Sequence, residues 1–247
     1  MRTGNPALSP ATFLDTERAS SQEDAMTIQG TINKTLVLLL CVLLTTGWTW
    51  SLYYKSGNPA SVAPWILIGA IGGFVAALVI TFKKTWAPIM APLYALLEGL
   101  FIGGVSATIE SSYPGIVIQA TGLTFGTLAC LLFAYRTGLI HVTEKFKLGV
   151  IAATGGIAIV YFISIILSLF GVKIPFIYGN GLIGIGVSLF IVIIAALNLV
   201  LDFDLIEQGS KSNLPKYMEW YGAFALMVTL IWLYIEILRL LSKIRSR

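Results

Sequence analysis

The sequence contains seven apolar runs, each close to the length that a helix needs to cross a membrane. They cover residues 35–54, 63–82, 88–108, 116–135, 148–170, 181–201 and 221–241. About 20 apolar residues in a helix span the ~30 Å hydrocarbon core of a bilayer. The runs are apolar nearly all round, whereas the strands of a membrane barrel are about 10 residues long and alternate apolar with polar residues. The sequence therefore predicts an all-α bundle of seven transmembrane helices.

The composition supports a chain that is embedded in lipid. Of the 247 residues, 57% are hydrophobic and 11% are charged, whereas soluble proteins carry about 25% charged residues. Lys and Arg stand at the ends of the runs, where they contact headgroups, so the net charge of +4 does not indicate a nucleic-acid partner. We expect a polar cytosolic tail over residues 1–30, flexible or weakly helical near residues 11–18, followed by a transmembrane domain over residues 31–247.

The distribution of basic residues predicts the orientation in the membrane. If the N-terminus is cytosolic, the inner segments hold ten Lys and Arg residues and the outer segments hold six. Basic residues are enriched in cytosolic loops. The loops thus favour a cytosolic N-terminus, although four of the six outer residues lie in the C-terminal tail and oppose it. We expect the N-terminus inside and, because the spans are odd in number, the C-terminus outside.

The sequence lacks the motifs of the common enzyme classes. His141 is the only histidine, which excludes His-rich metal sites and any triad with a histidine base. There is no His-Glu-x-x-His motif, Walker A loop or Gly-x-Ser-x-Gly elbow. The last run has no lysine before Lys243, so a retinal Schiff base is not predicted either. We expect neither an enzyme nor a resident cofactor.

Carboxylates within or beside the apolar runs are the candidate functional residues. They are Glu98 in the third run, Asp202 and Asp204 at the end of the sixth, and Glu219 and Glu236 near the two ends of the seventh. An ionised carboxylate at the centre of a membrane helix costs on the order of 2.5–3.5 kcal/mol on insertion scales. Such groups usually face a bundle interior or a water-filled path. They therefore suggest proton or cation chemistry inside the membrane.

Each of these carboxylates also has a purely structural interpretation. Glu98 could be a neutral side chain bonded to a neighbouring helix, and the two aspartates could be solvated by headgroups. Glu219 stands at a helix start, where the helix dipole favours negative charge. Arg239 follows Glu236 by three residues and could pair with it.

Residue counts place the acids at different depths. If the sixth helix ends at Gly209, Asp202 lies about 9 Å inside that end. The uncharged run Trp220–Ile235 covers 16 residues, or about 24 Å, so Glu236 is expected in the outer part of the membrane. The acids then form one site if the sixth helix carries Asp202 deeper. Otherwise they mark two stations along one path, with Glu98 between them.

Small residues at four-residue spacing predict the faces on which helices pack. They are Gly69, Gly73 and Ala77 in the second run, Ala87, Ala91, Ala95, Gly99, Gly103 and Ala107 in the third, and Gly122, Gly126, Cys130 and Ala134 in the fourth. Such stripes let helices approach closely in lipid. Because Glu98 adjoins the stripe of the third run, we expect it to face protein rather than lipid.

Three segments resemble the transmembrane Bax inhibitor motif family, the Bax inhibitor-1-like proteins, in a bacterial form. They are Glu98–Gly103, Asn198–Asp204 and Leu233–Leu241, within a resemblance that covers roughly residues 30–241. It implies seven helices with the last one central, a bacterial inner membrane, and a pH-sensitive calcium leak. Ca²⁺ or H⁺ is then the transported ion. Asp202 and Asp204 offer oxygen ligands to Ca²⁺ in transit, and no firm metal site is expected.

The resemblance also implies a proton-sensing pair, made by one aspartate on the sixth helix and one on the seventh. Asp202 matches the first. Glu236 matches the second through its Leu-Tyr-x-acid context, whereas aligning Leu238–Leu241 with the C-terminal pattern of the family places Thr229 there instead. Protonation of the carboxylates at low pH would change the packing of these two helices. We therefore expect a pH-sensitive cation leak or a proton-linked ion transporter.

Other residues and another class of function remain open. Lys83 and Lys84 precede the third run, where the family has an arginine that helps the sensor pair, and Arg239 is a further candidate cationic partner. The alternative function is a regulator that binds another membrane protein, such as a protease, as some relatives are implicated in doing. The polar tail over residues 1–30 would be the natural handle for such a partner.

Overall fold

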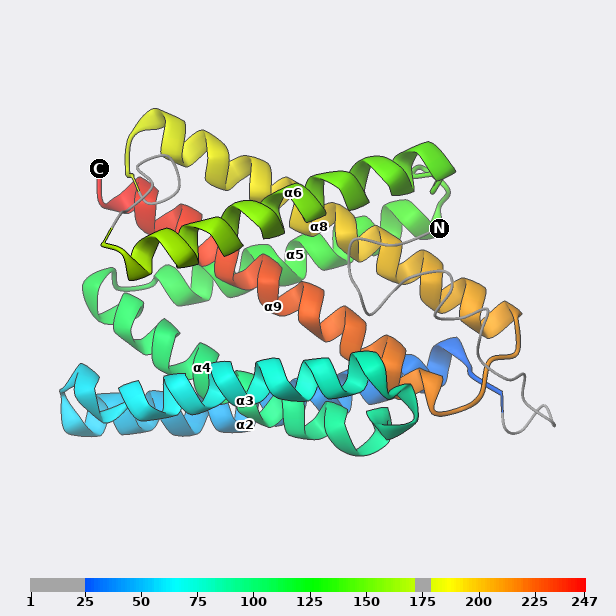
Figure 1. Ribbon diagram of the computed structural model, residues 1–247, viewed down its shortest axis with the longest axis horizontal. Helices are drawn as coiled ribbons and strands as arrows, with labels where there is room; N and C mark the ends of the chain where they lie inside the picture. Colours follow the sequence, from blue (N-terminus) through cyan, green and yellow to red (C-terminus); the bar gives the residue numbers. More distant parts are fainter. Residues whose placement is uncertain (1–24, 172–178) are drawn as a thin grey trace. The chain divides into compact units, whose positions relative to one another are not determined.

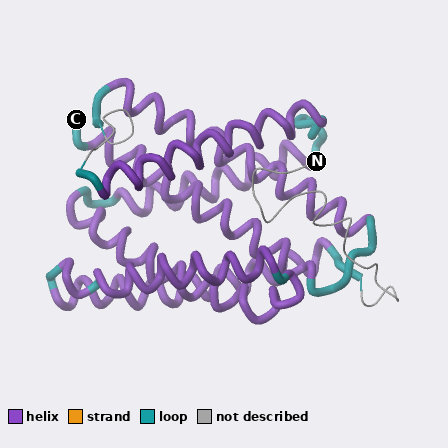
Figure 2. The backbone as a smooth tube through the Cα atoms, viewed as in Figure 1, coloured by secondary structure: helices purple, strands orange, loops and turns teal. Residues whose placement is uncertain are grey.

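The computed structural model describes residues 25–171 and 179–247, most of which form long helices (Figure 2). The helices are α2 (Ile28–Ser56), α3 (Ala63–Phe82), α4 (Ala87–Ser112), α5 (Ile116–Arg136), α6 (Glu144–Leu169), α8 (Leu182–Lys211) and α9 (Met218–Arg245), with short 3-10 turns η3 (Pro59–Ser61) and η4 (Lys84–Trp86) (Figure 1). Within these ranges the only β contact is an isolated bridge between Ala25 and Pro215.

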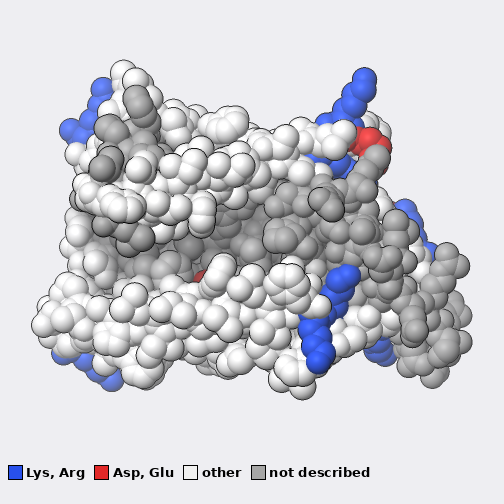
Figure 3. All heavy atoms as spheres, viewed as in Figure 1, with Lys and Arg blue, Asp and Glu red and all other residues white. Residues whose placement is uncertain are grey.

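Seven of the described helices are long and apolar enough to cross a membrane, which confirms the predicted all-α transmembrane fold. The described surface drawn in Figure 3 is mostly uncharged, with a few groups of Lys and Arg side chains and very few acidic ones. Such a surface suits contact with lipid tails, where the backbone polar groups of each helix are satisfied within the helix itself.

The first helix starts earlier than its apolar run. α2 begins at Ile28 because the hydroxyl of Thr27 accepts a hydrogen bond from the backbone N–H of Gly30 at 2.9 Å, which satisfies one of the free donors of the first turn. The last residues of the expected polar tail therefore belong to structured chain. Residues 1–24, including the weak helix expected near residues 11–18, lie outside the described residues.

The sixth span ends later than expected. The depth estimate for Asp202 assumed a helix end at Gly209, and that assumption is wrong, because α8 continues through Gly209 to Lys211. The chain reverses at Asn213 instead, which has a φ of +51°, and asparagine tolerates this left-handed conformation better than most residues. Asp202 therefore lies about 14 Å, rather than 9 Å, from the end of its helix.

Residues 25–114 and 204–228 form one of two compact units. In this unit α4 packs against both α2 and α3 (Figure 1). A Cβ at Gly99 would lie 2.0 Å from Thr45 Oγ1 of α2, and one at Gly69 of α3 would lie 2.5 Å from the backbone of α4. The stripes predicted for the second and third runs are therefore packing faces.

The stripe of the fourth run behaves differently. A Cβ at Gly122 or Gly126 of α5 would meet no described atom within 4 Å. The prediction that these two glycines let a neighbouring helix approach closely is therefore wrong for the part of the chain that the structure describes. The four-residue spacing alone cannot distinguish the two cases.

Residues 115–203 and 229–247 belong to the second unit. Its buried core brings Ile157 of α6 against Ile191 and Ile194 of α8, with Trp232 of α9 packed beside them. Both α8 and α9 contribute residues to each unit. Of the seven spans α9 is the most buried, with 56% of its most apolar window inside the protein.

Candidate functional site

Two contacts show that α8 and α9 run antiparallel in the second unit and set their register. Lys243 Nζ donates hydrogen bonds to Ser188 Oγ at 2.8 Å and to the backbone oxygen of Gly184 at 3.1 Å. Further along, the side chain of Thr229 hydrogen-bonds the carboxyl group of Asp202. Ser188 and Asp202 are fourteen residues apart on α8, and their partners are fourteen residues apart on α9. The register of the two helices is therefore constant over about 21 Å.

Asp202 is buried at this interface, and none of the described Lys or Arg residues pairs with it. It is 1% exposed, Thr229 is 2% exposed, and Asp202 Oδ2 has no hydrogen-bond partner among the described residues. Buried polar atoms in proteins nearly always have a partner, because leaving one without costs about 1–3 kcal/mol and more if the group is charged. An oxygen of this kind is suited to hold a proton or to accept a cation.

A neutral amide lies one helical turn from this carboxyl group. Asn198 is 6% exposed and precedes Asp202 by four residues, so both side chains lie on the same face of α8. Its Nδ2 donates to Thr154 Oγ1 of α6 and to the backbone oxygen of Ile194, both at 2.8 Å. These two bonds use the amide donors, and the amide oxygen of this side chain is an acceptor.

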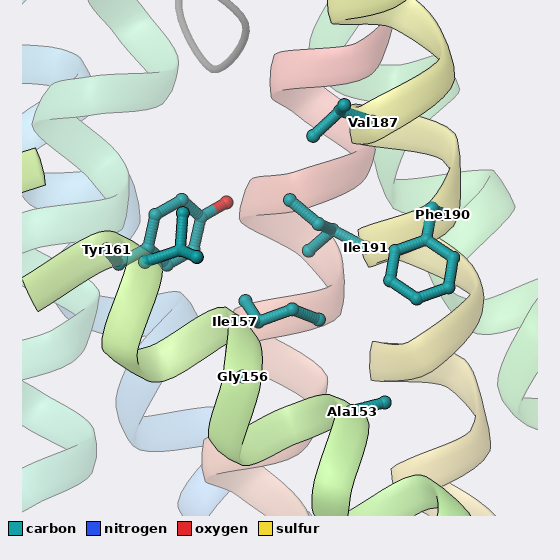
Figure 4. A pocket seen from close by; sticks show the side chains of 8 residues that line it. Ala153, Gly156, Ile157, Tyr161, Val187, Phe190 and Ile191 are labelled. Atoms are coloured by element: carbon teal, nitrogen blue, oxygen red, sulfur yellow. The ribbon is translucent and has the colours of Figure 1, made fainter. Parts of the chain in front are cut away.

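Glu236 belongs to a different polar cluster. The Tyr161 hydroxyl of α6 donates to Glu236 Oε1 at 2.7 Å, and in Figure 4 it points toward α9. Arg239 Nη1 donates to the two carboxylate oxygens at 3.1 and 3.2 Å, and its guanidinium lies 5.2 Å from the centroid of the Tyr161 ring. Glu236 is 1% exposed. This carboxylate is therefore compensated by a cation, whereas Asp202 has no such partner among the described residues.

The geometry pairs Asp202 with Thr229 and gives Glu236 other partners. Thr229 precedes Glu236 by seven residues, or about 10 Å along α9. Of the two residues that the sequence left open for the position opposite Asp202, Thr229 is the one in contact with it. Thr229 lies in the middle of the uncharged run Trp220–Ile235. Asp202 is thus level with the centre of that run.

Glu98 lies in the first unit, where it contacts α3. Its side chain is half-buried, and a Cβ at Gly73 of α3 would come within 2.7 Å of Glu98 Oε1. The carboxyl group therefore packs against bare backbone of α3. It faces protein there, as the adjoining small-residue stripe predicts.

The remaining candidates of the first unit lie near helix ends. Asp204 Oδ2 accepts a hydrogen bond from Gln208 Nε2 at 2.6 Å, one turn further along α8. Lys83 Nζ lies 4.2 Å from the centroid of the Trp86 ring, and Lys84 begins η4. These contacts are local, between residues less than two helical turns apart.

Glu219 joins α9 to the start of α2. It is 1% exposed and accepts hydrogen bonds from Thr27 N at 2.9 Å, from Thr27 Oγ1 at 2.8 Å and from Lys34 Nζ. Gly30 permits this approach, because a Cβ there would lie 2.1 Å from Glu219 Oε1. Its carboxylate is thus fully used by structural contacts within the first unit.

Sequence reasoning did not single out three members of these clusters. Tyr161 is one tyrosine within an apolar run, and Lys243 looks like a headgroup anchor near the C-terminus. Lys34 is 185 residues from its partner Glu219. Their roles depend on which helices meet, and no local pattern reports that.

An apolar groove of about 360 Å³ lies between α6 and α8 in the second unit (Figure 4). Its walls are formed by Ala153, Gly156, Ile157, Val160, Tyr161, Val187, Phe190 and Ile191. Tyr161 brings the one polar group, and that hydroxyl is bonded to Glu236. The groove therefore offers poor ligands for an ion, and Asp202 is the better candidate site.

Comparison with known proteins agrees with this architecture. A protein-family model described as Bax inhibitor 1 like matches residues 5–246. Neither the comparison with curated proteins nor that with solved structures gave a match. The matched range includes all seven described helices, the Asp202–Thr229 contact and the Glu236–Arg239 pair. The chain therefore belongs to the Bax inhibitor 1 like family of membrane proteins.

Proposed function

We propose that this protein is a pH-sensitive cation leak in which Asp202 is the protonatable group of the ion pathway. The observation that supports the proposal most strongly is the unpartnered Oδ2 of Asp202, which is buried between α8 and α9. The resemblance to the Bax inhibitor-1-like proteins supports the same activity, since it implies a proton-sensing aspartate at this position.

The charge of Asp202 would control the passage of cations. An ionised carboxylate in a dry interface is unfavourable unless an opposite charge compensates it, and none of the described Lys or Arg residues pairs with Asp202. Of the described residues, Thr229 hydrogen-bonds the carboxyl group, and Asn198 lies one turn away on α8. Ionised Asp202 therefore attracts a cation, and protonated Asp202 does not. Cation flux should rise as the pH rises.

Protonation would also change the contact between the two helices. Ionised Asp202 can only accept the Thr229 hydrogen bond, whereas a protonated carboxyl can donate one. A proton and a cation thus compete for the same oxygen. If each exchange of a proton for a cation at this oxygen moves both ions across the membrane, the protein is a proton-linked transporter.

The membrane and the orientation are part of the proposal. We place the protein in the inner membrane of a bacterium with its N-terminus in the cytosol, on the basis of the family resemblance and the distribution of Lys and Arg. Protease protection of tags at the two ends, in membrane vesicles of known sidedness, tests this orientation. Tags that are both digested from the same side would contradict it.

The test of function is cation flux into liposomes that contain the purified protein. Asp202→Asn keeps the size of the side chain and removes its charge, so we expect it to hold flux at the low-pH level of the wild type. Glu144→Gln is the matched control, because it removes an exposed carboxylate at the start of α6. Wild-type flux in Asp202→Asn would contradict the role assigned to Asp202.

A further inference from the structure

Asp202 supplies the one negative charge that the described residues place at this site, because Asp204, two residues further on, lies on a different face of α8 and accepts a hydrogen bond from Gln208. The described residues in contact with it or one turn from it on α8 add a hydroxyl from Thr229 and an amide from Asn198, both of them neutral. The next acid along α9, Glu236, is two turns away and is paired with Arg239. In the described part of the chain, no three His, Cys, Asp or Glu side chains come together as a metal site.

One negative charge balances a monovalent cation but not a divalent one. Ca²⁺ takes 6–8 oxygen ligands, and its affinity for a protein site follows the number of charged ligands. With Ca²⁺ beside Asp202, one positive charge would stay uncompensated at a buried position, which is strongly unfavourable. With Na⁺, K⁺ or H⁺ the charges cancel, and hydroxyl and amide oxygens can complete the shell.

We infer that the Asp202–Thr229 site passes monovalent cations in preference to Ca²⁺, and that Thr229 sets this selectivity. This inference rests on the proposed function, because it takes Asp202 as part of the ion pathway. Thr229 supplies a neutral oxygen at the position where a carboxylate would add a second charge opposite Asp202. Its effect is therefore on the choice of ion rather than on the presence of flux.

The experiment compares Na⁺ and Ca²⁺ entry into liposomes that carry wild-type protein, Thr229→Asp or Thr229→Asn. Asp and Asn have nearly the same size, so the pair isolates the added charge. At about pH 8 we expect the wild type to pass Na⁺ at least about tenfold faster than Ca²⁺, and Thr229→Asp to lower that ratio by at least about tenfold. Thr229→Asn should keep the ratio of the wild type.

Each outcome bears on the inference or on the function. Equal Na⁺ and Ca²⁺ fluxes in the wild type, both lost in Asp202→Asn, would overturn the inference and leave the proposed function standing. A folded Thr229→Asp with the wild-type ratio would overturn the role of Thr229. If Thr229→Asp is not monodisperse in detergent, the ratio of Na⁺ to Ca²⁺ flux in the wild type, and the loss of that flux in Asp202→Asn, decide whether the site prefers monovalent cations. Cation flux that is insensitive to Asp202→Asn contradicts the proposed function itself.

Discussion

The Thr229 side chain hydrogen-bonds the Asp202 carboxyl group between α9 and α8, and Asp202 Oδ2 is left without a partner among the described residues. Two turns further along α9, Glu236 is held by Arg239 and Tyr161. On α9, Thr229 thus contacts an acid that has no cation among the described residues, whereas Glu236 is an acid that has one. This difference decides which carboxylate we assign to proton and cation binding.

Removing the Thr229 hydroxyl should destabilise the protein. Thr229→Val keeps the shape of the side chain but leaves the buried Asp202 carboxyl without its donor, which costs about 1–3 kcal/mol. We expect a lower melting temperature in detergent, with a larger loss at high pH, where Asp202 is ionised and needs the donor more. Thr229→Ser keeps the hydroxyl and should melt closer to the wild type. Equal melting of the Val and Ser variants at high pH would speak against the contact.

The pair of Glu236 and Arg239 should show strong coupling. Arg239→Gln leaves the buried Glu236 without its cation, and we expect a loss of about 2–3 kcal/mol, below the ~3–5 kcal/mol of a fully buried pair because Arg239 is partly exposed. The double variant with Glu236→Gln should be less destabilised than the sum of the two single changes. A double-mutant cycle on detergent melts measures this, and additive losses would show that the pair is not coupled.

Gly30 and Gly47 of α2 provide a matched pair for the Glu219 contact. A Cβ at Gly30 would lie 2.1 Å from Glu219 Oε1, whereas one at Gly47 would meet no described atom within 4 Å. Gly30→Ala should displace the Glu219 carboxylate from Thr27 and lower stability by about 1–3 kcal/mol. Gly47→Ala should be neutral or slightly stabilising, because alanine favours helix by about 0.5–1 kcal/mol over glycine. Melting curves that rank the two variants in the opposite order would refute the contact.

Gly103 of α4 and Gly126 of α5 test the two small-residue stripes in the same way. A Cβ at Gly103 would lie 2.6 Å from the backbone oxygen of Thr46 in α2, whereas Gly126 has open space. We expect Gly103→Ala to push α2 and α4 apart and to destabilise by about 1–3 kcal/mol. Gly126→Ala should be tolerated. Comparable losses in both variants would mean that α5 packs closely after all.

The seven helices could be predicted because the length of an apolar run is a local property of the sequence. The ends of α2 and α8 could not, since they depend on Thr27 as a cap and on Asn213, rather than Gly209, as the point of reversal. Asp202 could be identified as an acid beside an apolar run. Its partner could not, because the choice between Thr229 and Glu236 needs the register of α8 against α9.

The central claim is that Asp202, and not the compensated Glu236, gives the protein its response to pH. The most direct measurement is cation flux in liposomes between about pH 5.5 and 8 for the wild type, Asp202→Asn and Glu236→Gln. We predict that flux rises with pH in the wild type and in Glu236→Gln, and that it stays at the low-pH level throughout in Asp202→Asn. A pH response that persists in Asp202→Asn, or that disappears only in Glu236→Gln, would contradict this account.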